Sequence, residues 1–253
     1  MEPRNSPTSA SVQSARADLE ELAERVRTGT GTPLRGPHTF DPELAAGYRR
    51  SAVLILFTPG GTALAPGLDL FLVQRSPYLR DHPGQIALPG GRIEPWDPTP
   101  VAAALRETHE EIGLAPEHVT ALGSLPDALV PVSRFVVTPV LAWADAADDL
   151  TVIEPGEVLH TLRIPVGAML APESRASVTI AGHRSAGFQL ATGWVWGFTG
   201  NLLDHVFSEL GWTRPWDVTR RYAMTPAEAR GAALDAPLDA PLDAPLVPPA
   251  DGD

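Results

Sequence analysis

The chain has 253 residues, no cysteine and a formal net charge of −12 at pH 7. This length suits one domain of roughly 150 to 200 residues with extensions, and the lack of cysteine excludes disulfides, thiol nucleophiles and cysteine-bound zinc. The acidic balance argues against a general nucleic-acid-binding protein, which needs a basic surface. No apolar run approaches the roughly 20 residues of a membrane span, and no signal-type apolar core opens the chain. We therefore expect a cytoplasmic protein that binds neither nucleic acid nor membrane.

The first element in chain order is a predicted helix over 17–27. Leu19, Leu22 and Val26 recur there at helical spacing, and Gly29 follows near its end. We interpret it as a short helix that docks on the domain. Residues 1–48 are accordingly predicted to form an N-terminal extension.

Two short apolar runs, 51–58 and 68–74, then predict buried strands. A turn of Pro59, Gly60 and Gly61 ends the first run, and a glycine-containing loop separates the two.

A basic loop follows the second predicted strand. Arg75, Ser76, Arg80 and His82 lie within eight positions of an otherwise acidic chain. A guanidinium can bind two phosphate oxygens at once, and an imidazole can donate or titrate. An ordinary polar surface loop is the alternative. Taken alone, the loop is more simply a polar surface loop. Together with the motif described below, its charge leads us to expect that Arg75, Arg80 and His82 bind substrate phosphates and that Ser76 is also a substrate-binding residue.

The next stretch, 89–114, combines a glycine turn at Gly90 and Gly91 with a helix that is rich in carboxylates and is predicted to end at Gly113. On a helix, Glu111 lies about 40° to one side of Glu107 and Glu110 about 60° to the other. The three side chains therefore share one narrow strip, although like charges at this spacing cost roughly 0.2–0.5 kcal/mol per pair. A divalent cation removes that repulsion, and clustered carboxylate oxygens suit Mg²⁺ or Mn²⁺. The alternative is a solvated acidic face.

Further elements are predicted downstream. The runs 119–125 and 135–143 are typical of strands, 178–180 and 187–190 suggest a hairpin, and 195–210 has the pattern of a closing amphipathic helix. Glu157 is a spare carboxylate that could approach the acidic strip, although a helix cap or a solvated turn is the simpler interpretation.

The C-terminal part, 214–253, is predicted to be an extension that ends in low-complexity sequence. DAPL occurs three times within 234–246, and no aromatic residue follows Tyr222. Such a segment cannot bury enough apolar surface to order itself. We expect that deletion of everything after Thr225 leaves turnover near normal.

The glycine turn and the acidic helix resemble the Nudix box, G-x5-E-x7-R-E-U-x-E-E-x-G-U with U aliphatic. The correspondence rests on Gly91, Gly113 and the R-E-x-x-E-E segment that begins at Arg106. Three positions depart from the pattern. Asp97 replaces the first glutamate, eight residues rather than seven separate it from Arg106, and Thr108 stands at an aliphatic position.

The preceding loop, Q-R-S-x-x-L-R-x-H-x-G-Q-x-x-x-P-G-G, resembles the additional motif of Nudix coenzyme A pyrophosphatases. Asp97 and the longer spacing are also features of that subfamily, whereas Leu88 replaces a common phenylalanine. The resemblance implies an α/β protein, with a Nudix-type α/β/α sandwich around a mixed sheet over 49–213. It also implies metal-dependent cleavage of coenzyme A or acyl-CoA into 3′,5′-ADP and 4′-phosphopantetheine.

The resemblance also implies roles for individual residues. Glu107, Glu111 and Glu110 hold Mg²⁺ or Mn²⁺, and Glu110 is a candidate general base, with Arg106 orienting a glutamate. Gly90 and Gly91, also expected among the substrate-binding residues, let the backbone approach the site closely. Two alternatives stay open: another Nudix substrate such as ADP-ribose, and a catalytically silent domain that only binds a nucleotide. A homodimer is one assembly compatible with these expectations.

Overall fold

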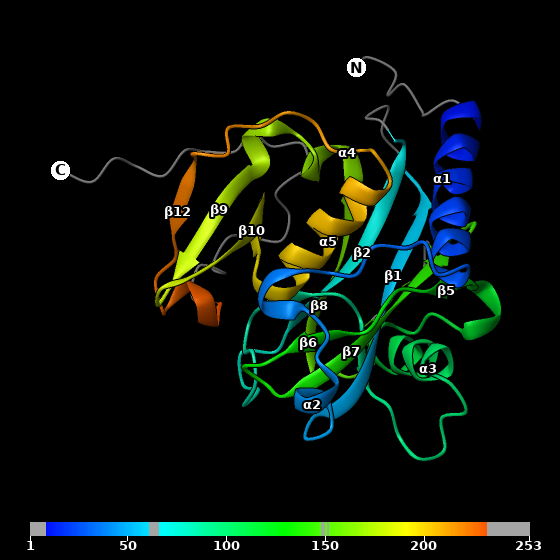
Figure 1. Ribbon diagram of the computed structural model, residues 1–253, viewed down its shortest axis with the longest axis horizontal. Helices are drawn as coiled ribbons and strands as arrows, with labels where there is room; N and C mark the ends of the chain where they lie inside the picture. Colours follow the sequence, from blue (N-terminus) through cyan, green and yellow to red (C-terminus); the bar gives the residue numbers. More distant parts are fainter. Residues whose placement is uncertain (1–8, 61–65, 148–149, 151, 232–253) are drawn as a thin grey trace.

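The strand β1 (Arg49–Pro59) lies at the centre of the larger of two sheets (Figure 1). The computed structural model describes residues 9–60, 66–147, 150 and 152–231. Within these ranges the larger sheet has the order β3-β2-β1-β7-β5, with β4 paired to β1, β6 to β7 and β8 to β2. The other seven strands are β2 (Leu68–Arg75), β3 (Ile86–Ala87), β4 (Gly90–Arg92), β5 (Thr120–Ser124), β6 (Ala128–Val130), β7 (Phe135–Trp143) and β8 (Val158–Pro165).

The sheet is mixed because β1 and β7 run parallel while its other neighbouring strands pair antiparallel. The parallel register extends from Arg49 opposite Phe135 to Phe57 opposite Trp143. Both strands are mostly apolar and buried, β1 from Ala52 onward and β7 from Val136 onward, which is typical of strands covered on both faces.

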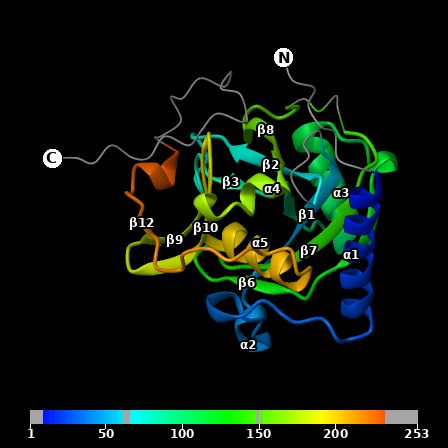
Figure 2. The ribbon, with the colours of Figure 1, turned by 90° about the horizontal axis from the view of Figure 1, so that it is seen from above.

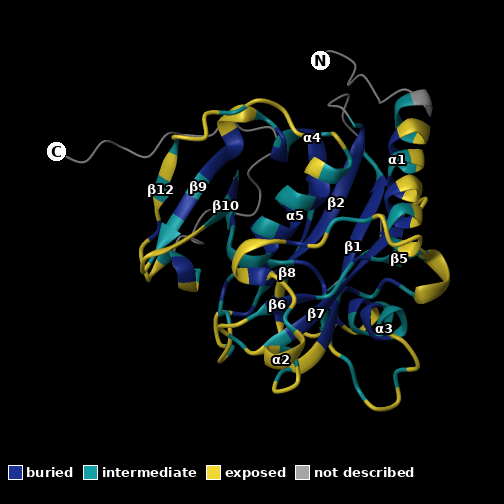
Figure 3. Cartoon of the chain, in the orientation of Figure 1, coloured by how far each residue is buried: buried dark blue, intermediate teal, exposed yellow. Residues whose placement is uncertain are grey.

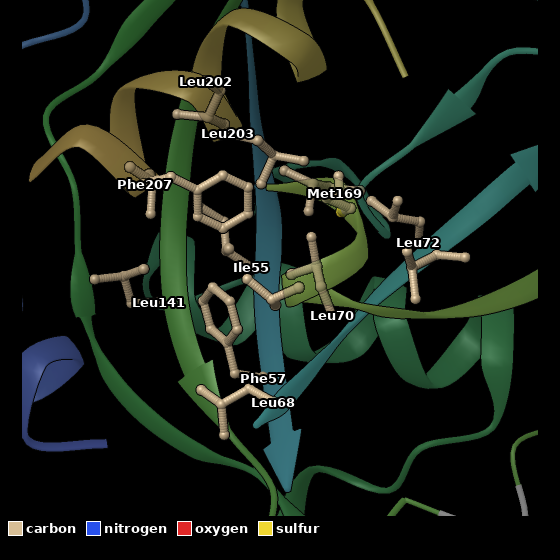
Figure 4. Close-up of a cluster of buried hydrophobic side chains, with 14 of the residues drawn as sticks. Ile55, Phe57, Leu68, Leu70, Leu72, Leu141, Met169, Leu202, Leu203 and Phe207 are labelled. Atoms are coloured by element: carbon tan, nitrogen blue, oxygen red, sulfur yellow. The ribbon is translucent and has the colours of Figure 1, made fainter. Parts of the chain in front are cut away.

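Two helices cover the opposite faces of this sheet, α3 (Pro100–Ile112) and α5 (Gly197–Glu209). Side chains alternate along β1, so that Leu54 packs in the cluster of α3 while Ile55 and Phe57 pack in the cluster of α5. Figure 4 shows Ile55 and Phe57 below Leu203 and Phe207 of α5. The buried strands between exposed loops are visible in Figure 3. The predicted α/β/α sandwich around a mixed sheet is confirmed.

The N-terminal helix α1 (Ser9–Arg27) packs on the same face as α5. Leu19 and Leu22 are buried there, and Trp212 donates from Nε1 to Asp18 at 2.8 Å. The docking helix is thus present, and it begins eight residues before the predicted start at Ala17. Ala15 is buried against the core, and such tertiary contact stabilises a helical turn that periodicity alone does not reveal. The short helices η1 (Gly36–His38) and α2 (Pro42–Ala45) lead into β1.

The second sheet has the order β11-β10-β9-β12. The predicted hairpin is confirmed, since β9 (Arg175–Ile180) and β10 (His183–Leu190) pair antiparallel. The predicted closing helix begins later than expected because Gly193–Val195 forms the strand β11. Beyond residue 213, β12 (Arg221–Ala223) runs parallel to β9, and the short helix η4 (Glu228–Arg230) follows it (Figure 2). The remaining short helices are α4 (Val166–Met169), η2 (Pro116–His118) and η3 (Pro172–Ser174).

The remaining expectations concern membrane spans, the C-terminal repeats, the domain bounds, the location and the assembly of the protein. In the described part of the chain, no helix is both long and apolar enough to cross a membrane. The repeats at 234–246 lie outside the described residues. The division at residues 48 and 213, the cytoplasmic location and the homodimer stay predictions.

Candidate functional site

The acidic helix α3 is delimited by local signals at both ends. Thr99 is the N-cap residue, and its hydroxyl accepts a hydrogen bond from the Ala102 N–H at 3.1 Å, with Pro100 in the first turn. Gly113 ends the helix in the left-handed conformation, with φ of 74°. Of the three glutamates, Glu107 and Glu111 lie against the β4 glycines, whereas Glu110 is exposed.

Two glycines of β4 let the backbone approach this strip. Gly90 has φ of 141°, and a Cβ there would lie 2.3 Å from the carbonyl oxygen of Ala52. Its N–H donates to Oε2 of Glu111 at 2.9 Å. A Cβ on Gly91 would lie 2.3 Å from Oε2 of Glu107. The predicted close approach is therefore present, and it brings Glu107 and Glu111 to adjacent glycines.

Burial strongly disfavours the ionised form of these two carboxyl groups. Glu111 is 3% exposed. Burial is the main reason why its pKa is raised to about 8, and the charges of Glu107 and Glu157 add to the effect. The pKa of Glu107 is also raised, again mainly by burial. Two desolvated carboxylates that repel each other are a donor set that a divalent cation would stabilise.

Arg106 gathers three carboxylates around one guanidinium. Its Nε and Nη2 donate to Asp97 at 3.0 and 2.8 Å. Its Nη1 lies 2.9 Å from Oε1 of Glu107 and 2.9 Å from Oε2 of Glu110. The pKa of Asp97 is lowered, mainly by its hydrogen bonds to Arg106, and that of Arg106 is raised. The ion pair expected between Arg106 and a glutamate is present.

The arrangement fits a divalent ion after one rearrangement. No group of three His, Asp or Glu side chains among the described residues converges on a point that could hold a metal. Glu107 and Glu110 bind Arg106, while Glu111 accepts from Gly90. Coordination by all three glutamates therefore requires both Glu107 and Glu110 to release Nη1 of Arg106. Asp97 can retain the guanidinium when this happens.

The basic loop follows β2 directly and lies beside this strip. Nε of Arg75 is buried and has no hydrogen-bond partner among the described residues. The charge of Arg75 lowers the pKa of Glu111 and also that of His82, for which burial is the larger cause. Arg75 thus lies near both the acidic strip and His82, whereas Arg80 is exposed.

Ser76 is buried within the basic loop. It is 2% exposed, and its hydroxyl accepts from the Tyr78 N–H at 3.4 Å. Its carbonyl accepts from Leu79 and Gly84, both at 3.3 Å. These contacts favour a role in shaping the loop over direct contact with a substrate.

Glu157 lies near the site, although a helix cap or a solvated turn was the simpler interpretation of its sequence position. Its negative charge raises the pKa of both Glu107 and Glu111. Its carbonyl accepts from the Ser76 N–H at 2.7 Å, which joins its turn to the basic loop. The only signal in the sequence was an unassigned acidic residue before a strand, and nothing local distinguishes it from a solvated turn.

The site lies in the part of the chain that resembles known proteins. Residues 47–176 match the family model of the NUDIX domain. A protein of Klebsiella pneumoniae named "Uncharacterized Nudix hydrolase NudL" is 32% identical over 179 residues, which are 66% of this chain and 85% of that protein. A NudL of Salmonella paratyphi B is 33% identical over 170 residues, 64% of this chain and 83% of that protein.

Two further likenesses cover less. The chain matches 37% of the length of the "Probable nudix hydrolase C6G9.05" of Schizosaccharomyces pombe, at 39% identity over 107 residues or 42% of this chain. Among solved structures, the Nudix hydrolase RenU of M. smegmatis is 25% identical, with a TM-score of 0.38 over 46% of this chain and 70% of that one.

Proposed function

The chain belongs to the Nudix hydrolase family, and we propose that it hydrolyses a pyrophosphate bond in a nucleotide derivative. The proposed substrate is coenzyme A or an acyl-CoA. Water cleaves the P–O–P bridge and gives 3′,5′-ADP and 4′-phosphopantetheine or its acyl derivative. Mg²⁺ or Mn²⁺ is the cofactor of the proposed reaction.

The unpartnered Nε of Arg75 carries this proposal. A buried guanidinium N–H without an acceptor is costly, and the oxygen of a bound phosphate would satisfy it. Arg75 acts electrostatically on Glu111 and on His82. A diphosphate bound between Glu111 and His82 would therefore lie beside Arg75. The basic loop, which resembles the coenzyme A pyrophosphatase motif, thus lies next to the carboxylates of Glu107 and Glu111.

Each residue of the strip has a distinct part in the proposed reaction. Glu107 and Glu111 hold the divalent ion, which supplies charge neutralisation of the diphosphate and activation of water. Glu110 is the most exposed of the three, with 47% of its side chain accessible. It serves as a further ligand or accepts the proton of the attacking water. Arg106 and Asp97 keep Glu107 oriented, and Arg75, Arg80 and His82 bind phosphates.

The test is product analysis with a panel of substrates. Purified protein is incubated with coenzyme A, acetyl-CoA, ADP-ribose and a dinucleoside polyphosphate, each with Mg²⁺ or Mn²⁺. We expect 3′,5′-ADP and 4′-phosphopantetheine to be the main products. Glu111→Gln is the inactive reference, and Glu117→Gln, an exposed residue of η2, is the matched control that retains activity.

Two results would contradict the proposal. Much faster hydrolysis of ADP-ribose or of the dinucleotide than of coenzyme A would assign the site to another Nudix substrate. No hydrolysis of any of the four compounds, with either ion, would indicate a nucleotide-binding domain without catalysis.

A further inference from the structure

The C-terminal segment after β12 is packed against the basic loop. Ala229 of η4 is buried, and its carbonyl accepts from Nε2 of Gln85 at 3.4 Å. The backbones approach so closely that a Cβ on Gly84 would lie 2.6 Å from the carbonyl oxygen of Arg230. Gly84 has φ of 67°, which favours glycine at this contact. Residues 226–231 therefore form part of the surroundings of the loop.

A pocket of about 330 Å³ lies between the loop and this segment. Arg80, His82 and Gln85 line it from the loop, and Arg230 lines it from η4. Trp196, at the start of α5, contributes an aromatic side chain that is only partly buried. The pocket thus combines cationic groups with an apolar aromatic surface.

The charge of this pocket is opposite to that of the protein. The chain has a net charge of −12, yet two guanidiniums line the pocket, and Asp81 is the only carboxylate among its described lining residues. Neither Arg80 nor Arg230 has a side-chain partner within the described part of the chain. Arginines that pair with no carboxylate, in a pocket that also contains a tryptophan, are suited to a phosphate and an aromatic base.

The position of the pocket relates it to the acidic strip. Gln85 lines the pocket, and its carbonyl accepts a hydrogen bond from the Arg75 N–H at 2.9 Å. Gly90, five residues further along the chain, donates its N–H to Glu111 of the strip at 2.9 Å. A substrate whose diphosphate lies at Arg75 can therefore extend past His82 toward Arg230.

We propose that this pocket binds the non-reacting end of the substrate, a nucleoside that carries a phosphate on its ribose, with Arg230 as the residue that recognises this phosphate. The inference rests on the proposed function and adds a determinant of specificity from the C-terminal extension. Trp196 offers a face on which the base can stack. Arg80, on the loop side of the pocket, binds the 5′-phosphate instead, which both nucleotides of the test below carry.

Direct binding of two nucleotides tests the pocket without turnover. Adenosine 3′,5′-bisphosphate and adenosine 5′-monophosphate are titrated calorimetrically into the full chain without metal. We expect the bisphosphate to bind about tenfold more tightly or better, as one charge-assisted hydrogen-bonded contact provides. Arg230→Met, which keeps the length of the side chain, removes this preference, and Arg230→Lys restores part of it. Arg184→Met, on the exposed side of β10, is the matched control and leaves it unchanged.

Equal affinities of the wild-type chain for the two nucleotides would overturn the inference. So would a preference that survives in Arg230→Met, or no binding of either nucleotide. Thermal unfolding of each variant checks that the fold is retained.

Two truncations separate η4 from the sequence beyond it. A chain that ends at Gly231 keeps the preference for the bisphosphate, whereas a chain that ends at Thr225 loses it. This replaces the expectation that everything after Thr225 is dispensable, because Ala229 and Arg230 contact the loop. Loss of the preference in the longer chain as well would show that η4 is not the determinant.

The outcome is distinguishable from failure of the proposed function. If the nucleotides behave as expected but coenzyme A is not hydrolysed, the pocket is assigned correctly and the reaction is not. If coenzyme A is hydrolysed and Arg230→Met has no effect on nucleotide preference, the reverse holds.

Discussion

Arg106 and Asp97 are joined by two hydrogen bonds, from Nε to Oδ1 at 3.0 Å and from Nη2 to Oδ2 at 2.8 Å. Asp97 replaces the first glutamate of the Nudix box and lies one position further from Arg106 than the general spacing allows. The side chain of Asp97 is only 4% exposed. The replacement thus places a short carboxylate where it can bind both nitrogens of the guanidinium, and leaves Nη1 for the glutamates.

The first prediction concerns this pair. Asp97→Asn lowers the free energy of unfolding by about 1.5–3 kcal/mol, the range for hydrogen bonds to charged groups. It also weakens Mn²⁺ binding, because Arg106 then competes more strongly for Glu107 and Glu110. Chemical denaturation and a Mn²⁺ titration measure the two effects. Asp41→Asn, which alters the N-cap of α2, is expected to leave Mn²⁺ affinity unchanged; unaltered Mn²⁺ binding in Asp97→Asn would refute the orienting role.

The second prediction separates Glu111 from Glu110. Glu111→Gln abolishes turnover but costs little stability at pH 7 without metal, because a carboxyl with a pKa of about 8 is mostly protonated there. The amide oxygen can still accept from the Gly90 N–H. Phosphate-product assays and thermal unfolding check this. Glu110→Gln, at an exposed position, lowers turnover without a change in unfolding temperature, and full activity in either variant would contradict the metal assignment.

The third prediction is a pH dependence of stability in the metal-free chain. Since the folded pKa of Glu111 is about 8 and its ordinary value is 4.5, the folded state binds more protons than the unfolded state between these values. The contribution is complete below about pH 4.5 and is lost as the pH rises through about 8, by up to about 1.4 kcal/mol per pH unit. Denaturation curves with a chelator, for the wild type and Glu111→Gln, measure the difference.

Metal reverses this trend. Because the ligands bind the ion in ionised form, Mn²⁺ affinity rises with pH over the same range. A wild-type curve that runs parallel to that of Glu111→Gln at all pH values would show that Glu111 is not perturbed by burial.

The fourth prediction contrasts the two glycines of β4. Gly90→Ala reduces stability by several kcal/mol, of the order expected from a strained φ together with overpacking, since its Cβ would lie 2.3 Å from the Ala52 carbonyl oxygen. Gly91→Ala instead displaces the Glu107 carboxylate, which lies 2.3 Å from its Cβ position, and weakens Mn²⁺ binding. Unfolding and metal titration are measured for both. Gly156→Ala, with open space around its Cβ, is the neutral control.

Local pattern predicted the elements with strong periodicity or clear end signals. The strand predicted over 135–143 is β7 with the same bounds, and the helix predicted to end at Gly113 does so. Strands of two or three residues, such as β3, β6 and β12, were not predicted. Segments so short show no periodicity, and pairing with a neighbouring strand defines them.

By itself, the sequence determined that three glutamates share a strip of one helix, that two glycines precede it, and that a basic loop lies between a buried strand and this turn. Helical spacing and backbone permissiveness act over a few residues, so a single sequence suffices to read them. Only the tertiary structure decided that Arg106 binds Asp97 as well as two glutamates, and that Glu157 acts on the strip. It also decided that Ala229 meets Gln85 across 144 positions of the chain. The contacts of Asp97 and Glu157 depend on the paths of the loops that carry them, and the contact of Ala229 depends on how the C-terminal segment packs on the basic loop. No local spacing encodes these three contacts.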